Sequence, residues 1–121
     1  MAFLLDTMTL SELRKRAKAN PCVLAWQSAH PGLGFVSVIT LNEIRFGIRS
    51  VARKDEAFAE RLELWYDEIL HAKDLFSLVP VDREIAETAA DLRSDFRMGY
   101  DDALIAATAK VRRLTLATVP V

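Results

Sequence analysis

Apolar and polar residues follow one another along the chain in short blocks, and the period of each block predicts a helix or a strand. Residues 1–6 form an apolar run that ends in Asp6, which is typical of a buried strand. Later, Leu62, Trp65, Tyr66 and Ile69 recur at the spacing of one helix face. In all, the pattern predicts strands at 1–6, 35–39, 76–81 and 114–118, and helices at 9–18, 23–26, 40–48, 56–72, 82–96 and 102–111.

Helix starts are marked by capping residues. Thr9 with Glu12, and Thr40 with Glu43, have the Ser/Thr-x-x-Glu spacing of a capping box, and Asp82 is placed to cap a third helix. The helix that Asp82 caps, at 82–96, is expected to bury one face, formed by Ile85, Ala89, Leu92 and Phe96. Because the predicted strands are separated by helices, we expect an α/β fold in which helices flank a parallel β-sheet in three α/β/α layers.

Composition narrows the class of protein further. The 121 residues, 51% of them hydrophobic, fit a single domain over 1–121. Sixteen basic and 17 acidic residues give a net charge of −1, which argues against tight, non-specific binding to duplex nucleic acid. The single cysteine, Cys22, allows no intramolecular disulfide. With neither a secretory leader nor a long apolar stretch, we expect a cytoplasmic protein with no membrane partner.

Three acids follow strands or open helices in the predicted sheet: Asp6, Glu43 and Asp102. Each has a structural interpretation, because Asp6 can cap the next helix, Glu43 completes a capping box, and Asp102 lies with Asp101 where the helix dipole favours negative charge. Together they meet where ligands bind in parallel sheets, at the carboxyl ends of the strands. Clustered carboxylates without a Cys/His set favour Mg²⁺ or Mn²⁺, which support phosphodiester hydrolysis.

Other catalytic chemistries have weaker support in the sequence. His30 and His71 are far apart and do not have the spacing of a zinc site. No Gly-x-Ser-x-Gly or Walker motif occurs, and Cys22 has no obvious histidine partner.

Five segments resemble PIN-domain toxins of the VapC type, especially the FitB-like branch. They are Leu4–Thr7 and Leu10–Arg14 near the start, Ser37–Ile44, Asp102–Ala109, and Leu114–Thr118. The resemblance extends over essentially the whole chain, and its Asp-Ala-Leu-Ile-Ala-Ala-Thr-Ala segment is the most specific part.

The resemblance implies a PIN fold and cleavage of RNA that depends on Mg²⁺ or Mn²⁺. It also implies a homodimer and a cognate antitoxin that blocks the site and tethers the complex to operator DNA. Carried over residue by residue, it makes Asp6, Glu43 and Asp102 the catalytic, metal-binding acids. Asp101 is the less favoured acid, because the family's acid directly precedes the Ala-Leu-Ile run.

Four further residues follow from the same resemblance. Thr7 would support the first acid, and Thr118 would lie beside the site. Arg14 and Arg45 are candidates for phosphate contact, with solvated surface roles as the alternative.

The chain departs from the family pattern in two places. Met8 stands where the family usually has asparagine. After Thr118, the family continues with Arg-Asn and a fourth acid, whereas this chain continues with Val119-Pro120-Val121. We therefore hypothesise missing loop segments near 93–101 and at 118–119, which an intact mass of 13.6 kDa would contradict.

Two other functions remain as alternatives to a ribonuclease toxin. A catalytically impaired PIN-like module that dimerises and binds an antitoxin is favoured by Met8 and by the missing fourth acid. A dehalogenase-like phosphatase would need an acid two residues after Asp6, where Met8 stands. A receiver domain would need an acidic pair beside the first strand and a lysine after the last one, and neither is evident. The sequence identifies neither the RNA nor the antitoxin.

Overall fold

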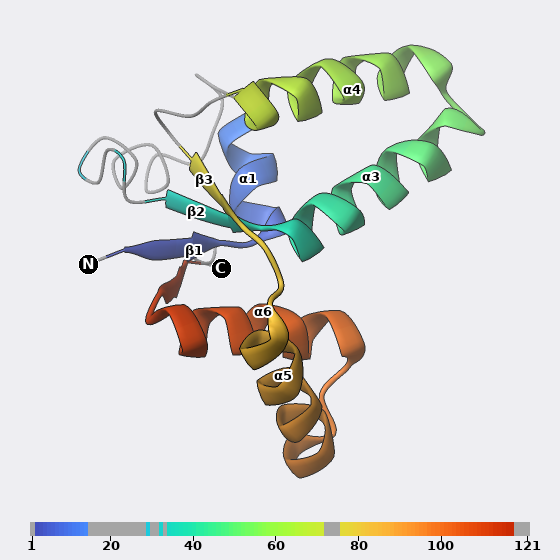
Figure 1. The fold of residues 1–121 in the computed structure, drawn as a ribbon. Coiled ribbons are helices and arrows are strands. Elements are labelled where there is room, and N and C mark those ends of the chain that lie inside the picture. The colour runs from blue at the N-terminus through green and yellow to red at the C-terminus, as the bar shows by residue number, and fades with distance from the viewer. Residues whose placement is uncertain (1, 15–28, 30–31, 33, 72–75, 118–121) are drawn as a thin grey trace.

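A four-stranded parallel sheet with helices on both faces forms the protein (Figure 1). The computed structural model describes residues 2–14, 29, 32, 34–71 and 76–117, with the side chains of 12–14 left out. The strands are β1 (Phe3–Leu5), β2 (Gly34–Ser37), β3 (Phe76–Val79) and β4 (Thr115–Ala117). The helices are α1 (Thr7–Arg14), α3 (Val38–Ala52), α4 (Glu56–His71), α5 (Arg83–Phe96) and α6 (Tyr100–Arg112).

The sheet has the order β3-β2-β1-β4, and every pairing is parallel. Leu4 of β1 lies opposite Phe35 of β2 and Leu116 of β4. Parallel neighbours need crossover connections, and the helices between the strands supply them. All four strands therefore end at one edge of the sheet, which confirms the predicted α/β/α arrangement.

Two cores lie on the two faces of the sheet. On one face, α1, α3 and α4 bury Leu10, Ile44 and Ile69 against Leu5 and Val36 of the strands. On the other face, α5 and α6 form a second core, whose buried members are Val79, Ile85, Ala89, Ala103, Leu104 and Ala107. Figure 1 shows α3 and α4 projecting from the sheet as a hairpin. No helix among the described residues has the length and apolar character needed to cross a membrane.

Three helix starts differ from the prediction, and one of them is that of α6, which begins at Tyr100 rather than Asp102. Helix α1 begins at Thr7 rather than Thr9, because Asp6 caps it and Thr9 is buried inside it. Helix α3 begins at Val38 rather than Thr40, because the Ser37 hydroxyl accepts the backbone N–H of Ile39 at 3.0 Å. The β-branched run over 35–39 resembles a strand throughout, yet the strand ends at Ser37. Both predicted capping boxes are therefore wrong.

The predicted helix at 82–96 is confirmed at both ends, whereas the predicted burial of its last residue is wrong. Asp82 Oδ1 accepts the N–H of Ile85 at 2.9 Å, as expected for a cap. Ile85, Ala89 and Leu92 contribute to the second core, but Phe96 is 70% exposed. The predicted helix at 23–26 lies outside the described residues.

Candidate active site

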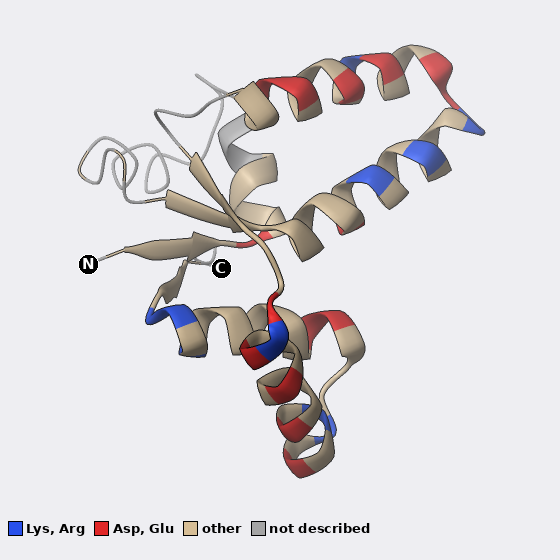
Figure 2. Ribbon diagram, viewed as in Figure 1, with Lys and Arg blue, Asp and Glu red and all other residues tan. Residues whose placement is uncertain are grey.

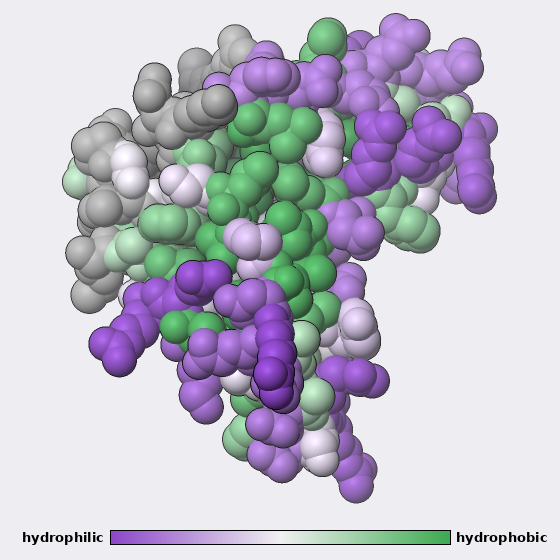
Figure 3. Space-filling model, in the orientation of Figure 1, coloured by the Kyte–Doolittle hydropathy of each residue, from purple (hydrophilic) through white to green (hydrophobic). Residues whose placement is uncertain are grey.

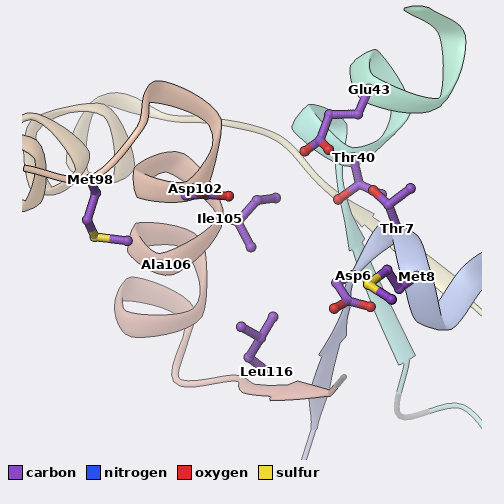
Figure 4. A pocket seen from close by; sticks show the side chains of 10 residues that line it. All are labelled: Asp6, Thr7, Met8, Thr40, Glu43, Met98, Asp102, Ile105, Ala106 and Leu116. Carbon is purple, nitrogen blue, oxygen red and sulfur yellow. The ribbon is translucent and has the colours of Figure 1, made fainter. Parts of the chain in front are cut away.

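The three acids singled out in the sequence come from three elements and line one pocket. Asp6 directly follows β1, Glu43 lies in the second turn of α3, and Asp102 lies in the first turn of α6. The pocket has a volume of about 430 Å³ and lies at the edge where the strands end (Figure 4). Its polar wall comes from β1, α1 and α3, and the opposite wall comes from α6 and Leu116 of β4.

Asp6 is held in place by the helix that it caps. Its Oδ1 accepts the backbone N–H of Thr9 at 2.8 Å. The Thr9 hydroxyl in turn donates to the carbonyl of Ala117 at 3.1 Å, which ties α1 to β4. The structural interpretation of Asp6 as a cap is thus confirmed, and the same bond fixes the orientation of its carboxylate beside the pocket.

Glu43 has no capping role. Because Ser37 caps α3, Glu43 lies one turn inside the helix, and its half-buried side chain lines the pocket. Burial raises the pKa of Glu43, and the nearby negative charges raise it further. These charges belong to Asp101, Asp102 and Asp6, in decreasing order of effect. A side-chain hydrogen bond with Thr7 opposes them by lowering the pKa. The acids are thus close enough to repel one another.

Asp102 and Asp101 open α6 without capping it. The N-cap residue, Gly99, has no side chain, and no side-chain cap hydrogen bond is made there. A Cβ atom built at Gly99 would lie 3.8 Å from Oδ2 of Asp102, so the glycine leaves room beside this carboxylate. Asp101 acts on Glu43 more strongly than Asp102 does, although it does not line the pocket. Asp102 lines the pocket and Asp101 does not, so the preference for Asp102 as the ligand stays a prediction, with Asp101 as a nearby charge.

The supporting residues from the sequence have different outcomes. Thr7 lines the pocket and bonds with Glu43. Arg45 points to α4 instead, where its guanidinium binds both carboxylate oxygens of Glu63 at 2.8 Å and lies 5.9 Å from the centre of the Tyr66 ring. Figure 2 shows basic residues along α3 and mainly acidic residues along α4. Thr118 and the side chain of Arg14 lie outside the described residues.

The remaining pocket residues include Met8, which the family pattern had already placed next to the first acid, and several residues that were not predicted from the sequence. Met8 is 68% exposed and lies beside Asp6 at the mouth (Figure 4). Thr40 adds a second hydroxyl next to Glu43, whereas Met98 and Ile105 make the α6 side apolar. The polar atoms are therefore concentrated around Asp6 and Glu43, with Asp102 facing them across the pocket.

The oxygen atoms that line the pocket are of the kind that binds a hard divalent cation. Carboxylates and hydroxyls are the ligands that Mg²⁺ and Mn²⁺ prefer, and a cation would relieve the repulsion that raises the Glu43 pKa. Within the described part of the chain, no three acidic, histidine or cysteine side chains are close enough together to hold a metal ion. The pocket acids are therefore of the ligand type that such a cation prefers, but in this structure their side chains are too far apart to bind one ion together.

Known proteins with similar sequences and folds were found. A ribonuclease, VapC14 of Mycobacterium tuberculosis, is 38% identical over 69 residues, which are 56% of this chain and 66% of that protein. The match thus spans slightly less than two thirds of that ribonuclease.

Two solved structures share the fold over nearly the whole chain. FitAcB from Neisseria gonorrhoeae superimposes with a TM-score of 0.74 and 29% identity, covering 96% of this chain and 86% of that one. A toxin–antitoxin complex from Klebsiella pneumoniae superimposes with a TM-score of 0.68 and 26% identity, covering 97% of this chain and 85% of that one.

A family model provides the broadest match. The model of the PIN domain matches residues 3–119, which include all the described strands and helices and the three pocket acids. This chain therefore belongs to the PIN-domain family.

Proposed function

We propose that this chain is a divalent-metal-dependent endoribonuclease that acts as the toxin of a bacterial type II toxin–antitoxin system. The observation that carries the proposal is the pocket of a PIN domain in which Asp6, Glu43 and Asp102 meet from three separate elements. The relatives support it, since one is named a ribonuclease and two others are a FitAcB assembly and a toxin–antitoxin complex.

The proposed metal ligands are the three pocket acids, and the ion is Mg²⁺ or Mn²⁺. When bound, such an ion lowers the pKa of a water molecule and stabilises charge on a phosphoryl oxygen. The Thr9 N–H orients Asp6, so this acid is held before substrate arrives, and Thr7 favours the charged form of Glu43 by lowering its pKa. Without a cation, the same acids repel the phosphates of RNA, so a bound cation would strengthen binding at the pocket.

The partners in this proposal are an RNA substrate, a cognate antitoxin and a second copy of the chain. Operator DNA is reached only through the antitoxin. The near-neutral charge of the chain, −1, agrees with a protein that does not bind duplex DNA by itself.

A cleavage assay tests the proposal. A panel of fluorescent RNAs is incubated with wild type and with Asp6→Asn, in Mg²⁺, Mn²⁺ or EDTA. Asparagine is as good a helix cap as aspartate, so this change removes the charge while retaining the start of α1. Asp82→Asn is the matched control, because Asp82 caps α5 away from the pocket.

The expected result is cutting by wild type and Asp82→Asn that EDTA abolishes and that Asp6→Asn lacks. Cutting that persists in EDTA would contradict the metal site. No cutting by antitoxin-free wild type, together with tight antitoxin binding, would favour the impaired binding module, with Met8 at the pocket mouth as its cause.

A further inference from the structure

The turn between α5 and α6 carries two exposed aromatic residues beside the pocket. Phe96, the last residue of α5, is 70% exposed, and Tyr100, the first residue of α6, is 64% exposed. Neither belongs to the core that α5 and α6 share. Figure 3 shows mainly hydrophilic residues on the visible face of α5 and α6, so the two exposed rings belong to a helix pair whose surface is otherwise largely polar.

The turn is continuous with the candidate active site. Met98 lies in the turn, and Met98 and Asp102 both line the pocket. Figure 1 shows the turn on the side of the sheet toward which β1 and β2 point, where the pocket lies. The turn is therefore connected to the pocket wall through Met98 and Asp102.

Basic side chains flank the two aromatic rings. The Arg93 guanidinium lies 4.9 Å from the centre of the Tyr100 ring, a cation–π contact that holds both groups at the surface. Arg97 follows Phe96 directly, and among the described residues it has no ion pair. Exposed aromatic rings with adjacent arginines are the combination that binds single-stranded nucleic acid, by stacking on bases and pairing with phosphates.

Arg97 also has an unusual backbone conformation. Its φ is 54° and its ψ is 35°, in the left-handed region that normally favours glycine at a helix C-terminus. An arginine at this position keeps a positive charge at the turn at a cost in conformational energy.

We propose that Phe96 and Tyr100, with Arg93 and Arg97, form a platform on which bases of single-stranded RNA stack while the strand enters the pocket. This platform rests on the proposed ribonuclease function, because it binds the substrate of that same site. It contacts bases and phosphates away from the reacting atoms, so it acts on affinity rather than on the chemical step.

Binding is measured separately from cutting. Fluorescence anisotropy follows a labelled single-stranded RNA of about 10 nucleotides in EDTA. We expect Phe96→Ala to weaken binding about ten-fold, since one stacked base accounts for an effect of that order. Phe96→Trp should retain the affinity. Leu64→Ala is the matched control, because Leu64 is 65% exposed but lies on α4 and does not line the pocket.

The contribution of the arginines is tested by measuring how RNA affinity depends on salt concentration. Each phosphate contact on a single strand contributes about −0.7 to the slope of log affinity against log salt, so Arg97→Gln should make the slope less steep by about 0.7. With metal present, Phe96→Ala should raise KM and leave kcat unchanged.

The outcomes separate this inference from the proposed function. Equal RNA affinity of wild type, Phe96→Ala and Leu64→Ala would overturn the platform, and metal-dependent cutting by the wild type would still support the ribonuclease. Binding that needs Phe96 without any cutting would support the platform and contradict the ribonuclease. Loss of self-association in Phe96→Ala, with RNA binding unchanged, would assign the surface to a second copy of the chain and overturn the platform.

Discussion

The two helices of the α5–α6 hairpin begin in opposite ways. At the start of α5, Asp82 caps the helix through Oδ1 and binds Arg112 of α6 through Oδ2 at 3.0 Å. At the start of α6, Gly99 provides no side-chain cap, while Asp101 and Asp102 stand in the first turn. The acid of α5 is thus used to hold the fold, and the acids of α6 remain available to the pocket. Within this hairpin the capping acid lies away from the pocket and the non-capping Asp102 lines it, although Asp6 shows that an acid can both cap a helix and line the pocket.

Asp102→Asn is expected to have the largest effect on function and a small one on folding. It removes a proposed metal ligand that lines the pocket. Because loss of even an outer-shell partner of a metal costs about 10- to 100-fold in activity, loss of a ligand should cost about 100-fold or more. RNA cleavage in Mg²⁺ measures the loss, and thermal unfolding in EDTA checks that the fold persists. Cleavage within a few-fold of wild type would remove Asp102 from the site.

Asp82→Ala tests whether the acid at the start of α5 serves the fold rather than the pocket. It removes the cap of α5 and the exposed ion pair with Arg112. Loss of the cap should lower the free energy of unfolding by about 1–2 kcal/mol, and the exposed pair adds little. Denaturant unfolding measures the decrease, while kcat should remain that of wild type. A stable but inactive Asp82→Ala variant would show that this acid also serves the pocket.

The same distinction explains what could be predicted from the sequence. That Asp6, Glu43 and Asp102 line one pocket followed from parallel topology, because the carboxyl ends of all strands meet at one edge. Local helix starts were harder. Val38 and Ile39 favour a strand by composition, and only the bond from Ile39 N–H to Ser37 shows that the helix has begun.

Tertiary position was not readable from periodicity alone. Phe96 continues the apolar spacing of α5, yet the helix ends there and the ring is exposed. Likewise, Arg45 follows Glu43 in the sequence by two positions, but the helix turns its side chain to Glu63 on α4. The period of apolar residues predicts which face of a helix is buried, but it does not show how far along that face the neighbouring elements extend.

Arg97→Gly separates stability from binding within the turn that joins the two helices. Glycine adopts a positive φ without steric cost, so the free energy of unfolding should rise by up to about 1 kcal/mol, partly offset by the greater flexibility of the unfolded chain. RNA affinity should nevertheless fall, since a charge is lost. Arg113→Gly is the control, because Arg113 has the same backbone conformation, with φ 56°, at the far end of α6. It should stabilise the protein to a similar extent and leave RNA affinity unchanged.

Glu43→Gln gives the smallest expected effect on stability, measured without metal, and tests whether the acids of α6 act on the pocket. Burial and the charges of Asp101 and Asp102 raise the folded-state pKa of Glu43 above its ordinary value of 4.5. The folded state therefore holds this proton more tightly than the unfolded state, so stability decreases as the pH rises from the unfolded pKa through the folded pKa. Glutamine does not undergo this loss.

In EDTA at pH 7, Glu43→Gln should consequently unfold about 1–3 °C above wild type, and the difference should vanish below the unfolded pKa, near pH 4. Asp101→Asn should reproduce part of the gain, because it removes the largest of the repelling charges. A Gln variant that is less stable than wild type at pH 7 would mean that the bond between Thr7 and the Glu43 carboxylate outweighs the repulsion. The charges of α6 would then be too weak to decide the stability of Glu43, and the contrast with α5 would rest on the position of Asp102 in the pocket wall.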